Sequence, residues 1–234
     1  MRFLCLSDIH GEADALAAVM ATAERRSYQR VLVAGDHCFP GPSALEVWRR
    51  LVQCGALCAQ GVGDRALATI DLESLQPCGD FERARFRRLV AMREELGERV
   101  LTHLAELPLV LREALPGGGQ LALVHGSPRD PLEPMTHDMS DEMLLHLVAD
   151  EPARLIVCGG SHVPFERAVR RPREDGTVDE IRIVNVGSVG EAPAAAGERV
   201  ANATFIECSK GVILVESFAV PLSQLGQDGG VTRF

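Results

Sequence analysis

The chain has 234 residues, of which 46% are hydrophobic and 24% are charged, a composition typical of a globular domain. Its formal net charge of -9 and its sequence pI near 5.3 exclude broad contact with a nucleic-acid backbone, because such contact needs a continuous basic surface. No apolar run approaches the ~20 residues of a membrane span, and we expect no signal peptide at the N-terminus. One domain that binds neither nucleic acid nor membrane is the simplest interpretation.

Seven cysteines occur at irregular spacings, and several of them lie inside apolar runs, where cysteine behaves as a small hydrophobic residue. Their number is odd and the sequence contains no Cys-x-x-Cys, so neither a disulfide framework nor a structural zinc site is predicted. This usage predicts a reducing, cytoplasmic location. The cysteines are Cys5, Cys38, Cys54, Cys58, Cys78, Cys158 and Cys208.

Short apolar runs recur along the chain, and each ends in glycine, aspartate, histidine or asparagine. In chain order these runs lead into Asp8 and His10, Asp36, Gly61 to Asp64, His125, His162, and Asn185 to Gly187. Continuous apolar runs of about four to six residues are typical of strands that are buried on both faces. The runs therefore predict a sheet covered by helices.

Helical patterns alternate with these strands. They cover Ala13–Arg25, Ser43–Cys54, Phe81–Leu96 and Asp141–Leu147, and two hairpins are predicted to turn at Gly117–Gly119 and Lys210–Gly211. The alternation predicts an α/β fold with a parallel or mixed sheet. We interpret the one basic cluster, Arg167–Glu174, as a solvated turn.

The polar residues at the strand ends form a candidate metal site, because ligands of such sheets gather at the carboxyl ends of the strands. Carboxylate and imidazole together suit Mn, Fe or Zn. A single histidine at a strand end is more often structural, but the ordered set is harder to explain by accident. The candidate ligands are Asp8, His10, Asp36, His125 and His162.

The sequence resembles the calcineurin-like metallophosphoesterases, in particular the small bacterial phosphodiesterases and the diadenosine-tetraphosphatase-like proteins. The resemblance rests on SDIHG, on GD at 35–36 followed by PGPSALEV, and on HGSPRDPLEPM, SHVPFERAV and NVGSVG. It implies an α/β (α+β) sandwich of two mixed β-sheets, packed face to face and flanked by helices. It also implies one domain at residues 1–220, and we expect a flexible tail at 221–234.

The resemblance implies two metal positions. The ligands expected for the first metal are all present, namely Asp8, His10, the bridging Asp36 and His162. The second metal would share Asp36 and use His125, but Val62 replaces an expected asparagine and Gly160 an expected histidine. The divalent metal implied is Mn first, with Fe, Zn, Ni or Mg as alternatives, and one ion is expected to be held tightly.

Catalytic and phosphate-binding candidates follow from the same resemblance. Gly63 occupies the position of a catalytic histidine, so Asp64 would be left without the partner that it orients in the family. The candidate catalytic residues are Asp36, Asp64 and Arg65, and Arg65 and Arg129 could bind phosphate. His37 could replace a missing ligand, but neighbours on a strand alternate faces, so we expect it to point away from Asp36 and to make a local hydrogen bond.

Two functions from different classes stay open. The chain is either a metal-dependent phosphoesterase with one tight and one weak or replaced metal, or a non-catalytic relative that binds a metal, a phosphorylated small molecule or nucleotide, or a protein partner. Because the losses fall in one half of the site, we favour little or no standard two-metal hydrolysis. The segment Gly79–Leu107 is a candidate lid or partner surface, although its amphipathic spacing also fits core packing.

Overall fold

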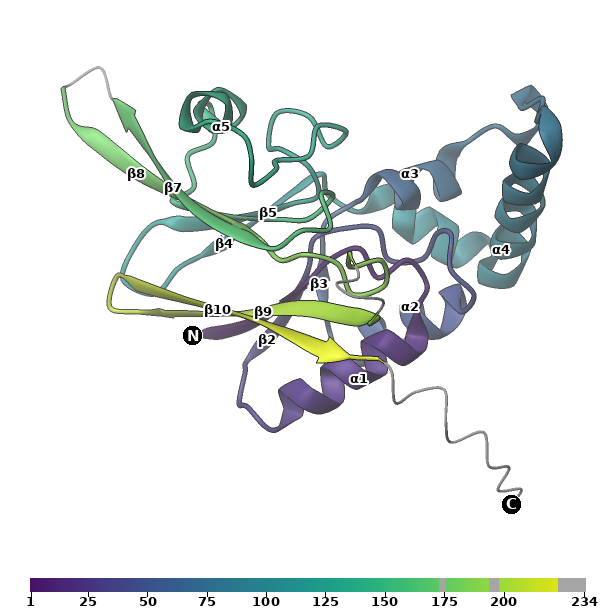
Figure 1. Ribbon diagram of the computed structural model, residues 1–234, viewed down its shortest axis with the longest axis horizontal. Coiled ribbons are helices and arrows are strands. Elements are labelled where there is room, and N and C mark those ends of the chain that lie inside the picture. Colours follow the sequence, from purple (N-terminus) through teal and green to yellow (C-terminus); the bar gives the residue numbers. More distant parts are fainter. Residues whose placement is uncertain (173–175, 194–197, 223–234) are drawn as a thin grey trace.

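The computed structural model describes residues 1–172, 176–193 and 198–222, whose strands form two five-stranded sheets (Figure 1). The two mixed sheets are flanked by helices, which confirms the predicted α/β sandwich. Of the expected tail, Pro221 ends the last strand and Leu222 is buried, whereas residues 223–234 lie outside the described part of the chain.

The first sheet has the strand order β10-β9-β1-β2-β3. Its strands are β1 (Arg2–Leu6), β2 (Arg30–Val33), β3 (Leu57–Cys58), β9 (Val200–Ser209) and β10 (Val212–Pro221). β1, β2 and β3 are parallel, with Leu4 opposite Val31, and β9 runs antiparallel to both β1 and β10. The hairpin predicted to turn at Lys210–Gly211 is confirmed.

The second sheet has the order β4-β5-β6-β8-β7. Its strands are β4 (Val110–Ala114), β5 (Gln120–Val124), β6 (Leu155–Cys158), β7 (Phe165–Pro172) and β8 (Val178–Asn185). β5, β6 and β8 are parallel, and the hairpin of β4 and β5 around Gly117–Gly119 is confirmed. Parallel strands in both sheets bring several carboxyl ends to one edge of the sandwich.

Alternation along β1 builds two hydrophobic layers at once, because successive side chains point to opposite faces of a sheet. Phe3 and Cys5 pack between the sheets with Leu123 of β5 and Val157 of β6. Leu4 and Leu6 face the other side, where they pack with the helices α1 (Ala13–Glu24) and α2 (Ala44–Gln53). The helix α5 (Asp141–Val148) covers the outer face of the second sheet (Figure 1).

A helical extension stands beside the sandwich (Figure 1). It consists of α3 (Val62–Thr69), a short 3-10 turn (Leu72–Ser74) and the long helix α4 (Gly79–Glu106), which packs on α3 and α2 through Leu89, Met92, Leu96 and Leu104. α4 is kinked at Gly97, where φ is 73°, directly after the predicted helix end at Leu96. Leu89 and Met92 are core residues, whereas Phe81 is 74% exposed.

Two elements differ from the sequence prediction. The basic residues from Arg167 to Pro172 belong to β7, not to a turn, and pair with β8 at the edge of the second sheet; residues 173–175 lie outside the described residues. Charged side chains are common on such edge strands, because they oppose pairing with another chain. The helix α3 was not predicted. Within the described residues no helix is both long and apolar enough to cross a membrane.

Candidate metal centre

All five predicted ligands gather at the carboxyl ends of the strands. Asp8 and His10 follow β1, Asp36 follows β2, His125 follows β5 and His162 follows β6. All except His162 are buried. The site therefore lies where the two sheets meet, and each sheet supplies part of it.

Four of these residues adopt a left-handed backbone conformation that side chains seldom tolerate. The φ angle is 51° at Asp8, 51° at His10, 53° at Asp36 and 60° at His162. The loops after β1 and β2 also hold each other, since His10 N donates to Asp36 O at 2.9 Å. Such conformations cost of order 1–3 kcal/mol each and are concentrated at functional sites. The backbone thus marks the same residues as the sequence motifs.

The ligand atoms form two overlapping groups, each within 4.8 Å: Asp8, His10 and His162, and Asp8, Asp36 and His125. Asp8 Oδ1 lies 3.2 Å from His162 Nε2, 3.7 Å from His10 Nε2 and 4.0 Å from His125 Nε2. Asp36 Oδ2 lies 3.6 Å from His125 Nε2. Asp8 belongs to both groups, and the bridging role that the resemblance implies for Asp36 stays a prediction.

Backbone carbonyls fix the orientation of the three imidazoles. His10 Nδ1 lies 2.7 Å from Phe39 O, His125 Nδ1 lies 2.8 Å from Ala34 O, and His162 Nδ1 lies 3.2 Å from Glu191 O. Because a carbonyl oxygen only accepts hydrogen bonds, each Nδ1 carries the proton. The second ring nitrogen, Nε2, lies 3.2 to 4.0 Å from Asp8 Oδ1 in each of the three histidines, and it carries a lone pair whenever the ring is neutral.

These atoms can share a cation. His10 Nε2 lies 3.3 Å from His162 Nε2, and the hydrogen bond to Asp8 raises the pKa of His162, so positive charge is favoured at this point of the site. Asp8 Oδ1 beside them is buried and has no hydrogen-bond donor of suitable geometry. A buried carboxylate oxygen without a partner is costly. The donor set therefore fits a divalent metal ion.

The two carboxylates differ in their tendency to ionise. Burial opposes the charge of Asp8, but His162, His125 and the N–H of Gly160 outweigh it and lower the pKa of this carboxyl. Burial raises the pKa of Asp36, and the nearby His125 offsets that rise only in part. Asp8 is therefore the firmly anionic donor of the centre.

His37 and Asp64 form a buried pair next to this centre. His37 Nδ1 lies 2.6 Å from Asp64 Oδ2, and both side chains are fully buried. Asp64 does have a histidine partner, but this is the buried His37 from another loop and not a residue at position 63. His37 does point away from the ligands, but its hydrogen-bond partner Asp64 lies 27 residues later in the sequence, so the bond is not local.

Comparisons with known proteins identify the family. The model of the calcineurin-like phosphoesterase superfamily domain matches residues 1–207. The chain belongs to the calcineurin-like phosphoesterase superfamily. A hypothetical protein from Pyrococcus horikoshii has a similar solved structure, with a TM-score of 0.71 and 19% identity over 94% of this chain and 87% of that one. A metallophosphoesterase from Sphaerobacter thermophilus gives 0.70 and 20% over 94% and 89%. No curated protein sequence matches this chain.

At these identities the solved structures support the fold alone, and the family is established by the domain match. Calcineurin-like phosphoesterases generally bind divalent metals and act on phosphorylated substrates. The two ligand groups of this chain are consistent with that metal chemistry.

Two of the three positions that we interpreted as degraded, Gly160 and Gly63, lie beside His125 and Asp36. A Cβ atom added to Gly160 would lie 3.6 Å from His125 Nε2, and one added to Gly63 would lie 3.2 Å from Asp36 Oδ1. Val62 begins α3 and is 37% exposed. The backbone still contributes, since Gly63 N donates to Asp36 Oδ1 at 2.7 Å. Side chains on the two glycines would reach the Asp36–His125 group.

The two predicted phosphate-binding arginines lie in different surroundings. Arg65 is exposed on α3, and within the described part of the chain its guanidinium makes neither a hydrogen bond nor an ion pair. Arg129 is also exposed, but its Nη1 donates to His146 Nε2 at 2.8 Å. Arg65 is therefore the freer of the two cations.

Glu191 was missed by the sequence analysis. Its Oε2 lies 3.7 Å from His10 Nε2 and 3.9 Å from His162 Nδ1. It directly follows the NVGSVG motif, and the N–H of Gly190 in that motif donates to Asp8 O at 2.9 Å. The position of an acidic residue immediately after this motif is the signal that could have revealed it.

Two buried polar residues of the same motif position the ligand loops. Ser188 Oγ donates to Asp8 O at 2.8 Å, and Asn185 Nδ2 donates to Gly159 O at 2.7 Å. Asn185 Nδ2 also lies 3.0 Å from Ser161 Oγ, one residue before the ligand His162. NVGSVG therefore braces both loops that carry candidate ligands.

Proposed function

We propose that this chain binds one divalent metal ion tightly, together with a phosphorylated ligand, and has little or no standard two-metal phosphoester hydrolysis. One observation carries the proposal. The Nε2 lone pairs of His10 and His162 and the unpaired Oδ1 of Asp8 converge within 4.8 Å, each held by the backbone or by burial. A donor set fixed in this way binds a metal with little reorganisation.

Two imidazoles with carboxylate suit Mn, Fe, Zn or Ni better than Mg, so Mn²⁺ is the first ion to test. Such an ion supplies Lewis-acid polarisation of a phosphoryl oxygen. The chain's own residues supply orientation, because the bracing of Asp8 by Ser188 and Gly160 fixes its carboxylate and its backbone carbonyl.

The second ion would be held weakly. Asp36, His125 and a share of Asp8 are its protein donors, while Val62, Gly63 and Gly160 add no lone pair from their side chains. The replacement considered from sequence, His37, is fully buried, and its Nδ1 is bonded to Asp64 and not to the ligand groups. Hydrolysis by two ions depends on both, because they stabilise the attacking and the leaving oxygen together.

The ligand we propose is a phosphorylated small molecule or a nucleotide, as the small-phosphodiesterase and diadenosine-tetraphosphatase-like branch would imply. The unpaired guanidinium of Arg65 supports this, since it can meet phosphoryl oxygens in bidentate fashion. A protein partner belongs to the same proposal if the chain is non-catalytic. A cytoplasmic location is supported by the seven cysteines, all free in the described part of the chain.

An active phosphoesterase is the second candidate, favoured by the Asp8–Asp36–His125 group. Its donor atoms also lie within 4.8 Å of one another. If substrate oxygens complete that group, a weakly bound second ion would suffice for turnover.

One experiment separates the two candidates. Purified protein is tested for hydrolysis of bis(p-nitrophenyl) phosphate with Mn²⁺, beside Asp36→Asn, while bound Mn²⁺ is counted after dialysis. We expect one ion per chain and no turnover above the variant. Turnover that needs Mn²⁺ and is lost in Asp36→Asn would overturn the first proposal in favour of the second. Protein that retains no ion would overturn both.

A further inference from the structure

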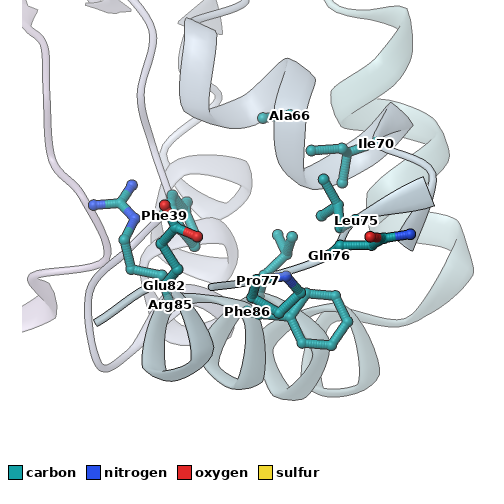
Figure 2. Close-up of a pocket in the computed structure, with 10 residues that line it drawn as sticks. Phe39, Ala66, Ile70, Leu75, Gln76, Pro77, Glu82, Arg85 and Phe86 are labelled. Atoms are coloured by element: carbon teal, nitrogen blue, oxygen red, sulfur yellow. The ribbon is translucent and has the colours of Figure 1, made fainter. Parts of the chain in front are cut away.

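A pocket of about 340 Å³ lies between α3, α4 and the loop after β2 (Figure 2). This volume is within the range of small-molecule sites, about 300–1,000 Å³. Figure 2 shows Phe39 and Arg85 at one side and Phe86 and Leu75 at the other. Ile70 and Leu89 complete its apolar walls.

The pocket is joined to the metal centre through one residue. The ring of Phe39 lines the pocket, whereas the carbonyl oxygen of the same residue lies 2.7 Å from the Nδ1 of the ligand His10. Gly41, two residues later, packs against the backbone of His10, because a Cβ on Gly41 would lie 1.7 Å from His10 O. One short loop therefore forms a pocket wall with its side chain and supports a ligand with its backbone.

The helix α4 is tied to that loop. Arg88 donates from Nε to Pro40 O at 3.3 Å and from Nη2 to Gly41 O. Its neighbours Arg85 and Phe86 line the pocket. These hydrogen bonds fix the helical extension against the loop after β2. The walls of the pocket between them are therefore held in place.

The pocket combines aromatic walls with the cation of Arg85 and with the carboxylate of Glu82, which accepts a hydrogen bond from Cys78 N at 2.7 Å. The guanidinium carbon of Arg85 lies 5.3 Å from the centre of the Phe39 ring and 6.0 Å from that of Phe81. Within the described residues Arg85 has these ring contacts but no carboxylate partner. Aromatic rings hold the guanidinium in place, and its planar N–H donors match the oxygens of a phosphate group, so it can bind a phosphate anion.

We propose that this pocket binds the aromatic group of a phosphorylated ligand, with Arg85 meeting its negative charge. The proposal rests on the proposed function, because the phosphoryl group is the part that the metal centre recognises. A planar ring can stack on Phe39 or Phe86, and the aliphatic walls exclude water from its edges. A nucleobase and a simple aryl group share this chemistry, so both sources belong to the test.

The test measures binding without the metal. Calorimetric titration of EDTA-treated protein uses 1-naphthyl phosphate, 1-naphthol and AMP as probes. The variants are Phe86→Ala, which removes a wall, and Arg85→Gln, which removes the cation. Arg87→Gln is the matched control, because Arg87 is exposed on the same helix and does not line the pocket. Circular dichroism establishes that each variant is folded.

We expect 1-naphthyl phosphate to bind, and Phe86→Ala and Arg85→Gln each to weaken it by about tenfold, while Arg87→Gln leaves it unchanged. AMP competing with 1-naphthyl phosphate supports a nucleotide as source, and its failure to compete supports another aryl phosphate. No binding of 1-naphthyl phosphate, equal binding of 1-naphthol, or binding insensitive to Phe86→Ala would overturn the inference. Since no metal is present, a failure of the proposed metal function would leave these results intact.

Discussion

The Asp64 carboxylate accepts hydrogen bonds from the His37 side chain and from backbone N–H groups of two loops, one after β2 and one after β3. Beside the 2.6 Å contact to His37 Nδ1, its carboxylate accepts from Asp36 N at 2.9 Å, His37 N at 2.9 Å and Gly61 N at 3.0 Å. Burial opposes its charge, but His37 and these N–H groups lower the pKa of Asp64 to about 2. Asp64 is thus an anionic brace of the loop that carries Asp36.

Substitution Asp64→Ala should therefore destabilise the fold. Removing one partner of a buried ion pair leaves the other charge and several N–H groups unpaired, which costs about 3–5 kcal/mol. Urea unfolding followed by circular dichroism measures the loss. Asp71→Ala is a suitable control, because Asp71 also accepts a backbone hydrogen bond but is exposed. A loss below about 1 kcal/mol for Asp64→Ala would show that the pair does not hold the loop.

Metal removal should destabilise the wild-type protein, and Asp8→Asn should abolish that dependence. At about 100 times its Kd, Mn²⁺ raises the free energy of unfolding by about 2.7 kcal/mol when it binds only the folded state. Asp8→Asn keeps an oxygen for the N–H of Gly160 but loses the charge that both ligand groups share. Thermal unfolding with EDTA and with Mn²⁺ gives the comparison. An equal Mn²⁺ effect in both proteins would place the ion elsewhere.

Loss of the clamp between α4 and the metal-bearing loop should weaken metal binding. Arg88→Ala removes the donors to Pro40 O and Gly41 O, next to the carbonyl that orients His10. Substitutions of such supporting groups reduce metal affinity about 10- to 100-fold. Titration with Mn²⁺ detects the change, and Arg83→Ala, which removes an exposed pair with Asp80, should leave affinity unaltered. Unchanged affinity in Arg88→Ala would mean that α4 does not support the centre.

The sequence predicted what depends on short-range patterns. Apolar runs that end at Asp8, Asp36 and His125 identified the strands, and parallel strands bring their ends together, so the convergence of these residues could be predicted without coordinates, while their role as ligands stays a prediction. The edge strand β7 was missed because Arg167 to Pro172 carry exposed charges, and its pairing with β8 is visible only once the sheet is formed.

Long-range contacts explain the remaining differences. The strand alternation correctly turned His37 away from the ligands, but only the folded chain brings Asp64, 27 residues later, to its Nδ1. α3 was missed because it is short and begins directly at Val62 and Gly63, which looked like a damaged loop. Glu191 reaches His10 and His162 from a third segment, and no local pattern records such a meeting.

Restoring the donors of the second half should restore a second metal ion. The double variant Val62→Asn/Gly160→His supplies an amide oxygen and an imidazole at the positions that differ from the family pattern. Residue 160 has a φ of 73°, so a histidine there would cost about 1–3 kcal/mol of backbone strain, as at His162, where φ is 60°. Its Cβ would lie 3.4 Å from Pro134 Cβ, which is ordinary contact, and 3.6 Å from His125 Nε2.

We expect bound Mn²⁺ to rise from one to two ions per chain. Hydrolysis of bis(p-nitrophenyl) phosphate should increase by at least about 100-fold, the effect of one strong electrostatic group in a transition state. Val62→Ala/Gly160→Ala controls for the backbone and the added Cβ. A second ion without any gain in hydrolysis would show that Gly63, where a histidine would lie close to Asp36 Oδ1, is the change that limits catalysis.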